Sequence, residues 1–260
     1  MKRYSCKSFV PIVAFLLILM LSPAVVTAEK LKFNTQDFRP FSYLEKGKVA
    51  GPVKEIIGAV CDKAGFEVEY ALFPWRRAVM EAKGGQAQGL FVLGWNKPRT
   101  EWLYFSDPIV KTEYGFFFHD EDPVNYTKPD DLQGKDYVVG VYGPSNTSTK
   151  LIEIAQKVND LRVVMTHDDI SGFKKLSIGR VSAVYSNKDV GLSIISEHKI
   201  KNIRYGGKER SLKYYIGLLK QYVSKENFDR FNKAYKELYI RGEIERILDR
   251  YGLELSEIDG

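Results

Sequence analysis

Short apolar segments alternate along most of the chain with segments whose apolar residues recur every three or four positions. Residues 66–72 alternate apolar and polar side chains, which predicts a half-buried strand. The segment after Gly51-Pro52 has its apolar side chains at helical spacing and stops at Gly65. Such alternation of strands and helices is typical of α/β proteins with largely parallel sheets.

The same reasoning predicts the other elements of the chain. Further strands are expected at residues 31–33, 90–93, 114–118, 137–142, 161–165, 181–185 and 214–219. Further helices are expected after Pro74, after residues 143–146, around 170–176, and over the apolar positions of 228–238 and 244–248. The pattern predicts two βαβαβ units followed by a strand and two helices. It leaves open which unit the closing helices pack against.

The first 28 residues are typical of a secretory signal peptide. Lys2, Arg3 and Lys7 precede an apolar run over residues 9–21, and small residues near Ala28 suit cleavage there. This run is shorter than the roughly 20 residues that a membrane-spanning helix needs, although an uncleaved anchor is the alternative. We therefore expect a signal peptide at 1–28 and a mature protein free in the periplasm.

The net charge, the cysteines and the histidines limit which partners, disulfides and cofactors are expected. The formal net charge of +6 falls to about +3 without the signal peptide, and the remaining basic residues are interspersed with acidic ones, which argues against nucleic acid. Removal of Cys6 leaves Cys61 on the apolar face of a predicted helix, where we expect a buried thiol and no internal disulfide. The three histidines lack metal-ligand spacing, so no metal or other cofactor is expected.

Six sequence blocks carry a resemblance to a known family. They are residues 37–43 (DFRPFSY), 73–78 (FPWRRA), 96–99 with 102–108 (NKPR, WLYFSDP), 131–135 with 139–141 (DLQGK, VGV), 179–181 (GRV) and 241–244 (RGEI). In this order and at these distances, they resemble the family 3 extracellular solute-binding proteins. That family is typified by the polar amino acid receptors of ABC importers.

The resemblance implies a two-lobed α/β fold of the periplasmic binding protein type II class. Each lobe would be a mostly parallel sheet flanked by helices, and two crossing strands would join the lobes. Lobe 1 is expected to comprise residues 29–118 and 213–260, and lobe 2 residues 119–212. The lobes of such proteins close on a small-molecule ligand by hinge motion. The implied partner is the membrane permease of an ABC transporter, and a monomer is expected.

The resemblance also implies ligand contacts from lobe 1. Arg99 matches the arginine that binds a ligand carboxylate, which suits the planar fork of a guanidinium; a surface ion pair with Glu101 is the alternative. Arg76 opens a helix, where positive charge opposes the helix dipole, and it either faces an anionic ligand or points to solvent.

Four aromatic residues are further candidates. Phe38 and Trp75 match the rings that sandwich the ligand's side chain in the family, and Phe41 also follows a strand end. Trp95 precedes the Arg99 loop and either lines the pocket or packs in the core.

Lobe 2 offers a polar helix start and one important departure from the family. Ser145, Asn146 and Thr147 begin a helix, where free backbone N–H groups suit an anion or an ordinary N-cap. Asn187 stands where amino acid receptors carry an aspartate that accepts the ligand's α-ammonium. Its neutrality weakens the case for an α-amino acid unless Asp189 substitutes. We predict a carboxylate-bearing ligand that resembles an amino acid.

Two other functions compete with transport. An enzyme related to the cyclohexadienyl dehydratases would need an acid or base in the cleft. The assigned cleft positions hold arginine, serine, asparagine and aromatic side chains, so we expect no enzyme. A ligand-sensing subunit for a membrane sensor is the other alternative, and the sequence does not separate it from a transport subunit.

Overall fold

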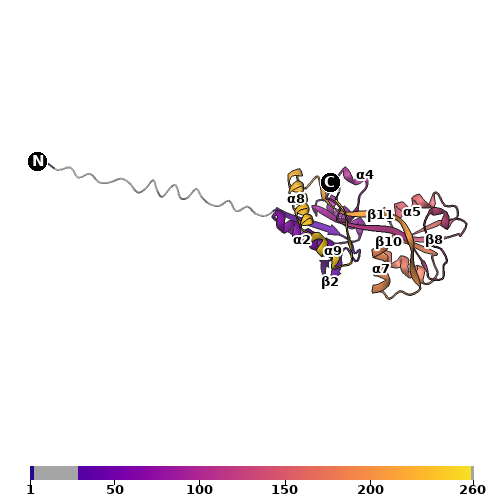
Figure 1. The fold of residues 1–260 in the computed structure, drawn as a ribbon. Coiled ribbons are helices and arrows are strands. Elements are labelled where there is room, and N and C mark those ends of the chain that lie inside the picture. The colour runs from indigo at the N-terminus through magenta and orange to yellow at the C-terminus, as the bar shows by residue number, and fades with distance from the viewer. Residues whose placement is uncertain (3–28, 259–260) are drawn as a thin grey trace.

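The computed structural model describes residues 1–2 and 29–258 (Figure 1). Apart from its first two residues, the predicted signal peptide at 1–28 lies outside the described part. Among the described residues, no helix has the length and apolar character that crossing a membrane requires. The chain forms two lobes of mixed α/β structure, as the resemblance implied.

The first lobe is built on three parallel strands, in the order β4–β1–β5. The strands are β1 (Glu29–Thr35), β4 (Phe66–Leu72) and β5 (Gly89–Gly94). The helices are α2 (Pro52–Ala64), α3 (Trp75–Lys83), α4 (Lys97–Thr100), α8 (Lys225–Ile240) and α9 (Glu243–Asp249). Helices α8 and α9 pack against α2, so the chain's closing helices return to this lobe (Figure 1). Short strands complete it: β2 (Tyr43–Glu45), β3 (Lys48–Ala50), β6 (Leu103–Phe105) and β12 (Glu254–Leu255).

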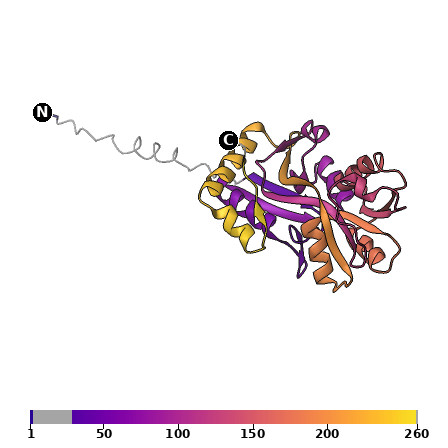
Figure 2. The same cartoon turned by 45° about the vertical axis from the view of Figure 1, so that its right-hand side comes forward.

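The second lobe continues the same sheet in the order β10–β8–β9. Its strands are β8 (Val138–Tyr142), β9 (Arg162–Thr166) and β10 (Ala183–Asn187), and all pair in parallel. Its helices are α5 (Asn146–Ala155), α6 (Asp169–Ser177) and α7 (Lys188–Glu197), with a 3-10 turn η2 (Pro129–Leu132). Figure 2 shows these helices gathered at the end of the molecule opposite α8 and α9.

Two long strands pass between the lobes. Strand β7 (Val110–His119) and strand β11 (Ile203–Leu219) pair antiparallel from Ile203↔His119 to Tyr214↔Val110. The end of β11 then pairs with β5 in the first lobe, whereas β7 pairs with β10 in the second. The ladder of β7 and β11 therefore joins the lobes, and any relative motion of the lobes must bend it.

Helix α2 shows how the local sequence sets an element. Pro52 occupies the first helical turn, where a missing N–H costs nothing, and Gly65 ends the helix with φ 74°. The side chain of Cys61 is fully buried in the core that α2 shares with α8, and burial raises its pKa to about 12. The expected buried thiol is thus found.

The pattern missed two elements that shape the second lobe. Helix α7 was not predicted, since only Val190, Gly191 and Ile194 are buried along it. Strand β11 was predicted only from Tyr214, yet it begins at Ile203. Its first half carries the glycine-rich and charged run 206–211, whose strand conformation comes from pairing with β7 and not from alternation of side chains.

Candidate functional site

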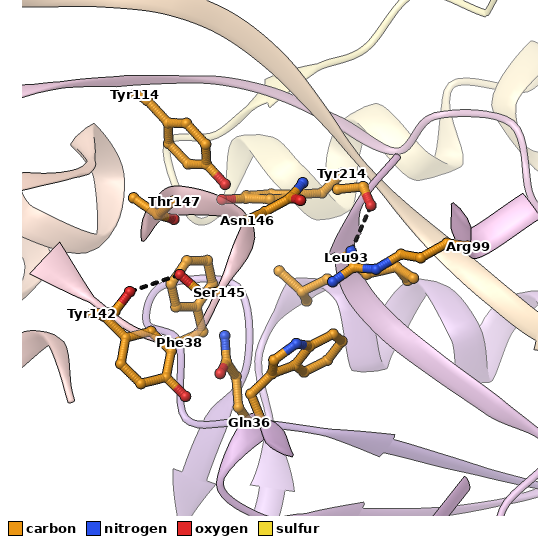
Figure 3. Close-up of a pocket in the computed structure, with 13 residues that line it drawn as sticks. Gln36, Phe38, Leu93, Arg99, Tyr114, Tyr142, Ser145, Asn146, Thr147 and Tyr214 are labelled. Atoms are coloured by element: carbon orange, nitrogen blue, oxygen red, sulfur yellow. Dashed lines mark hydrogen bonds between the residues drawn. The ribbon is translucent and has the colours of Figure 1, made fainter. Parts of the chain in front are cut away.

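The candidate site lies where strand ends of the two lobes face each other. Phe38 follows β1 and Trp75 opens α3 after β4, while Tyr142 ends β8 in the other lobe. The carboxyl ends of parallel strands are the edge at which open α/β sheets bind ligands. We call the space between them the Arg99 pocket; it is lined by Phe38, Trp75, Arg99, Tyr114, Tyr142, Ser145, Asn146, Thr147 and Tyr214, with Gln36 and residues 92–94 (Figure 3).

Arg99 is held inside this pocket by backbone contacts. The Asn96 side chain caps α4 by accepting the Arg99 N–H at 3.0 Å, and Arg99 Nη1 donates to the Gly94 carbonyl at 2.6 Å (Figure 3). Its guanidinium lies 5.4 Å from the centre of the Trp75 ring. Burial lowers the pKa of Arg99 below its ordinary value.

No carboxylate pairs with this arginine among the described residues. The alternative partner considered from the sequence, Glu101, is exposed and makes no ion pair with it. Arg99 is half-buried, and a partly desolvated guanidinium without an anionic partner is costly, because a desolvated charge needs a compensating one. The Arg99 pocket is therefore suited chemically to a ligand that brings a carboxylate.

The start of α5 adds further anion-binding groups opposite Arg99. Ser145 is the N-cap: its Oγ accepts the Ser148 N–H at 3.2 Å and donates to the Tyr142 carbonyl at 2.7 Å. Thr147 is buried and hydrogen-bonds to the Tyr114 hydroxyl. The N-terminus of this ten-residue helix, with its partial positive charge, faces the pocket.

Of the other predicted aromatic and basic residues, the structure places some in the lining of the Arg99 pocket and others outside it. Phe38 and Trp75 line the pocket, whereas Phe41 is fully buried behind it and packs edge-on against Tyr214 at 5.2 Å. Trp95 is 55% exposed and lies outside the pocket lining. Arg76 is also exposed and outside the lining.

Strand β5 is irregular where it meets the pocket. Val92 has φ 58°, in the left-handed region that a β-branched residue rarely adopts, and the register with β11 shifts between Tyr215 and Ile216. Such a conformation costs about 1–3 kcal/mol and persists only where the surroundings enforce it. The bulge lies beside Gly94, whose carbonyl positions Arg99.

Asn187 lies against the crossing strands and does not line the Arg99 pocket. It is 1% exposed; its Oδ1 caps α7 by accepting the Val190 N–H at 3.1 Å, and its Nδ2 donates to Thr112 at 2.8 Å and to Tyr214 at 3.2 Å. Asp189 accepts a hydrogen bond from Thr112 at 2.6 Å. Both side chains are thus engaged with the crossing strands.

Asp169 is a cleft residue that the sequence reasoning missed. It begins α6, and Oδ1 accepts a hydrogen bond from Ser186 at 2.9 Å. Burial raises its pKa to about 6, and the neighbouring Asp168 adds a smaller effect in the same direction. The hydrogen bond from Ser186 acts in the opposite direction and lowers the pKa. The run His167-Asp168-Asp169 directly follows β9, so its place at a strand's carboxyl end was the available signal.

The lobes touch each other across the cleft. Asn96 Nδ2 donates to Asn146 Oδ1 at 3.2 Å, the Tyr142 hydroxyl hydrogen-bonds to the Trp75 backbone, and Arg39 pairs with Glu197 at 3.3 Å. The Arg99 pocket has a volume of about 30 Å³, room for only one or two waters. The Arg99 pocket by itself therefore has no room for a whole molecule of amino acid size in this conformation.

A family model for the bacterial extracellular solute-binding proteins, family 3, matches residues 32–254. The chain belongs to this family. The match covers most of the chain and confirms the resemblance that the six sequence blocks indicated. A comparison with curated protein sequences gives no match.

Solved structures similar to this solute-binding protein share its fold at low sequence identity. A histidine kinase sensor domain similar to periplasmic binding proteins has a TM-score of 0.78 at 21% identity, covering 88% of this chain and 99% of its own. An ancestral arginine-binding protein bound to arginine has a TM-score of 0.75 at 22% identity, covering 85% and 97%. The arginine-, lysine-, histidine-binding protein ArtJ from Geobacillus stearothermophilus has a TM-score of 0.73 at 19% identity, covering 86% and 95%.

The pKa of Asp169 predicts a pH dependence of this solute-binding protein's stability. The folded state holds this proton up to about pH 6, whereas an unfolded aspartate releases it near pH 4. The free energy of unfolding should therefore fall as pH rises between these values, by up to about 3 kcal/mol. Urea unfolding across this range should show the fall in the wild type, and Asp169→Asn should lack that component; parallel curves for the two proteins would contradict the assignment.

Proposed function

We propose that this protein captures a small, carboxylate-bearing, amino acid-like ligand between its lobes and delivers it to the permease of an ABC importer. In this proposal a signal peptide exports it to the periplasm, where it acts as a monomer. The first lobe would comprise residues 29–118 and 213–260, and the second 119–212. Closure of the lobes would bend the ladder of β7 and β11.

The observation that carries this proposal is Arg99, a half-buried guanidinium in the pocket wall that no carboxylate of the described chain neutralises. The start of α5 adds backbone N–H groups on the opposite wall. A ligand carboxylate between them would receive charge-assisted hydrogen bonds from both lobes, and it would favour the closed form by its differential contacts. The arginine-binding neighbours support an amino acid-like ligand.

The proposal is tested by a thermal-shift screen of the mature protein against amino acids, dicarboxylates, amides and amines. We expect carboxylate-bearing compounds to raise the melting temperature, since a ligand that binds only the folded state stabilises it by mass action. Each hit is compared with its decarboxylated analogue, such as L-arginine with agmatine. Equal stabilisation by agmatine, or stabilisation by no carboxylate at all, would overturn the proposal.

A second candidate is a ligand-sensing subunit for a membrane sensor, which the similarity to a histidine kinase sensor domain favours. The two roles differ in the membrane protein that responds to the liganded form. Transport requires that the liganded protein stimulate ATP hydrolysis by a reconstituted permease and ATPase. Sensing requires that it change the autophosphorylation of a kinase.

We propose that the protein binds its ligand without converting it. The presence of Asp169 in the cleft means that this proposal needs a test. A carboxylate whose pKa lies near 6 can act as a general base, so the cleft contains one group that an enzyme would need. No cluster of metal-binding side chains accompanies it in the part of the chain that the structure describes. Ligand recovered unchanged after long incubation, checked by NMR, is the expected result; conversion to product would show an enzyme.

A further inference from the structure

A larger cavity adjoins the Arg99 pocket and shares Gln36, Phe38, Trp75 and Tyr142 with it. It has a volume of about 580 Å³. This lies within the range of about 300–1,000 Å³ that is common for small-molecule sites. Four carboxylates from both lobes line it: Asp37, Asp168, Asp169 and Glu197. We call it the acidic cavity.

The basic side chains in the acidic cavity do not reach all of its carboxylates. Arg39 pairs with Glu197 at 3.3 Å, and His167 lies 2.9 Å from Asp168. Asp169 makes no ion pair with a basic side chain within residues 29–258, and its bond from Ser186 engages one carboxylate oxygen. Asp169 is half-buried in the cavity wall, and its second carboxylate oxygen is available to a cation.

The other walls suit the rest of a cationic ligand. The rings of Phe38, Trp75 and Tyr142 stand at the junction with the Arg99 pocket, and the faces of aromatic rings attract cations. Apolar side chains at Leu72 and Ile170 offer contact to a methylene chain. The acidic cavity thus combines a negative group, aromatic faces and apolar surface, the elements that recognise an ammonium or guanidinium on an aliphatic arm.

Asn187 offers no charge to a cationic group of the ligand. Its amide is committed to Thr112, Tyr214 and the start of α7, and it carries no charge. Asp169 comes from a different helix and supplies the charge that Asn187 lacks.

We propose that the acidic cavity binds a cationic group of the ligand at Asp169, so that the ligand is a small dipolar molecule with its carboxylate at Arg99 and an ammonium or guanidinium on an extended arm. This inference rests on the proposed function, because it takes the Arg99 pocket as the carboxylate end. It adds the chemical class of the ligand group at the end opposite the carboxylate.

The test uses pairs of carboxylates that differ in the charge of the arm: L-arginine with L-citrulline, and L-lysine with L-norleucine. Affinities are measured by calorimetry at pH 7.5, where Asp169 is ionised because its pKa is about 6. We expect the charged member of at least one pair to bind more tightly to the wild type. Asp169→Asn should lower that affinity about 30-fold or more, as expected when one partner of a desolvated charge pair is removed, and should leave the neutral member's affinity within a few-fold.

The matched control is Asp160→Asn, which makes the same charge change at an exposed turn residue outside the cavity and should leave both affinities unchanged. Asparagine can still accept the Ser186 hydrogen bond, and an unchanged circular dichroism spectrum would establish that the Asp169 variant is folded. Arg99-dependent binding of only the neutral members would overturn this inference and leave the proposed function standing. Binding of no carboxylate would overturn both.

Discussion

Arg99→Ala is expected to abolish ligand-induced thermal stabilisation while leaving the melting temperature of the ligand-free protein nearly unchanged. The side chain makes one hydrogen bond, to the Gly94 carbonyl, and neutralises no acidic group of the described chain. Its removal therefore takes little from the folded state, and relieves the cost of a desolvated charge. The bound ligand, by contrast, loses charge-assisted hydrogen bonds in a buried pocket, which should weaken binding by about 100-fold or more.

Two further variants separate charge from geometry in this experiment. Arg99→Lys keeps the charge but not the planar fork, so we expect an intermediate loss of affinity. Arg76→Ala removes the same charge from an exposed position outside the Arg99 pocket, and should bind ligand as the wild type does. An equal fall in ligand-free stability for Arg99→Ala would show a structural role instead. A loss of binding in Arg76→Ala would restore that residue to the site.

The sequence predicted those elements whose ends carry their own chemical signals. Helix α2 lies between Gly51-Pro52 and a left-handed Gly65, and β4 has regular alternation, so both were placed to within a residue or two. Helix α7 has an N-cap in Asn187 but few buried positions along it, and the first half of β11 lacks regular alternation. They depend on contacts with β7 and on the second lobe's core, which local patterning does not encode.

The site residues also divide into those that the sequence signals locally and those that depend on the assembled fold. Phe38, Trp75 and Arg99 follow strand ends, and the structure brings them into one pocket with Ser145, Asn146 and Thr147; their contact with ligand stays a prediction. Tyr114 and Tyr214 were not foreseen, because they lie within the crossing strands and reach the pocket only through the approach of the two lobes. Asp169 also follows a strand end, but it lies outside the six family blocks of the sequence.

Gly115→Ala is expected to destabilise the fold at the strands that join the lobes. Gly115 lies in β7 opposite β11, and a Cβ atom there would stand 2.3 Å from the Gly207 carbonyl oxygen and 2.3 Å from the Tyr205 hydroxyl. The tyrosine can turn aside, but the carbonyl belongs to the ladder's backbone and moves only if the pairing of β7 with β11 is distorted. Overpacking of this kind costs about 3 kcal/mol, which should lower the melting temperature by about 6–12 °C.

Gly140→Ala is the matched control for this prediction, because it makes the same change in β8 at a buried strand position where a Cβ would meet only ordinary contacts of 3.6 Å or more. Its melting temperature should stay close to that of the wild type. Equal melting temperatures for the two variants would show that the β7–β11 ladder accommodates the extra methyl group without loss of stability. If the ladder is also the hinge, Gly115→Ala should weaken ligand binding in proportion to the distortion. No pocket residue would be substituted, so the loss would come from the distorted crossing strands, which also carry Tyr114, and not from a deleted side chain.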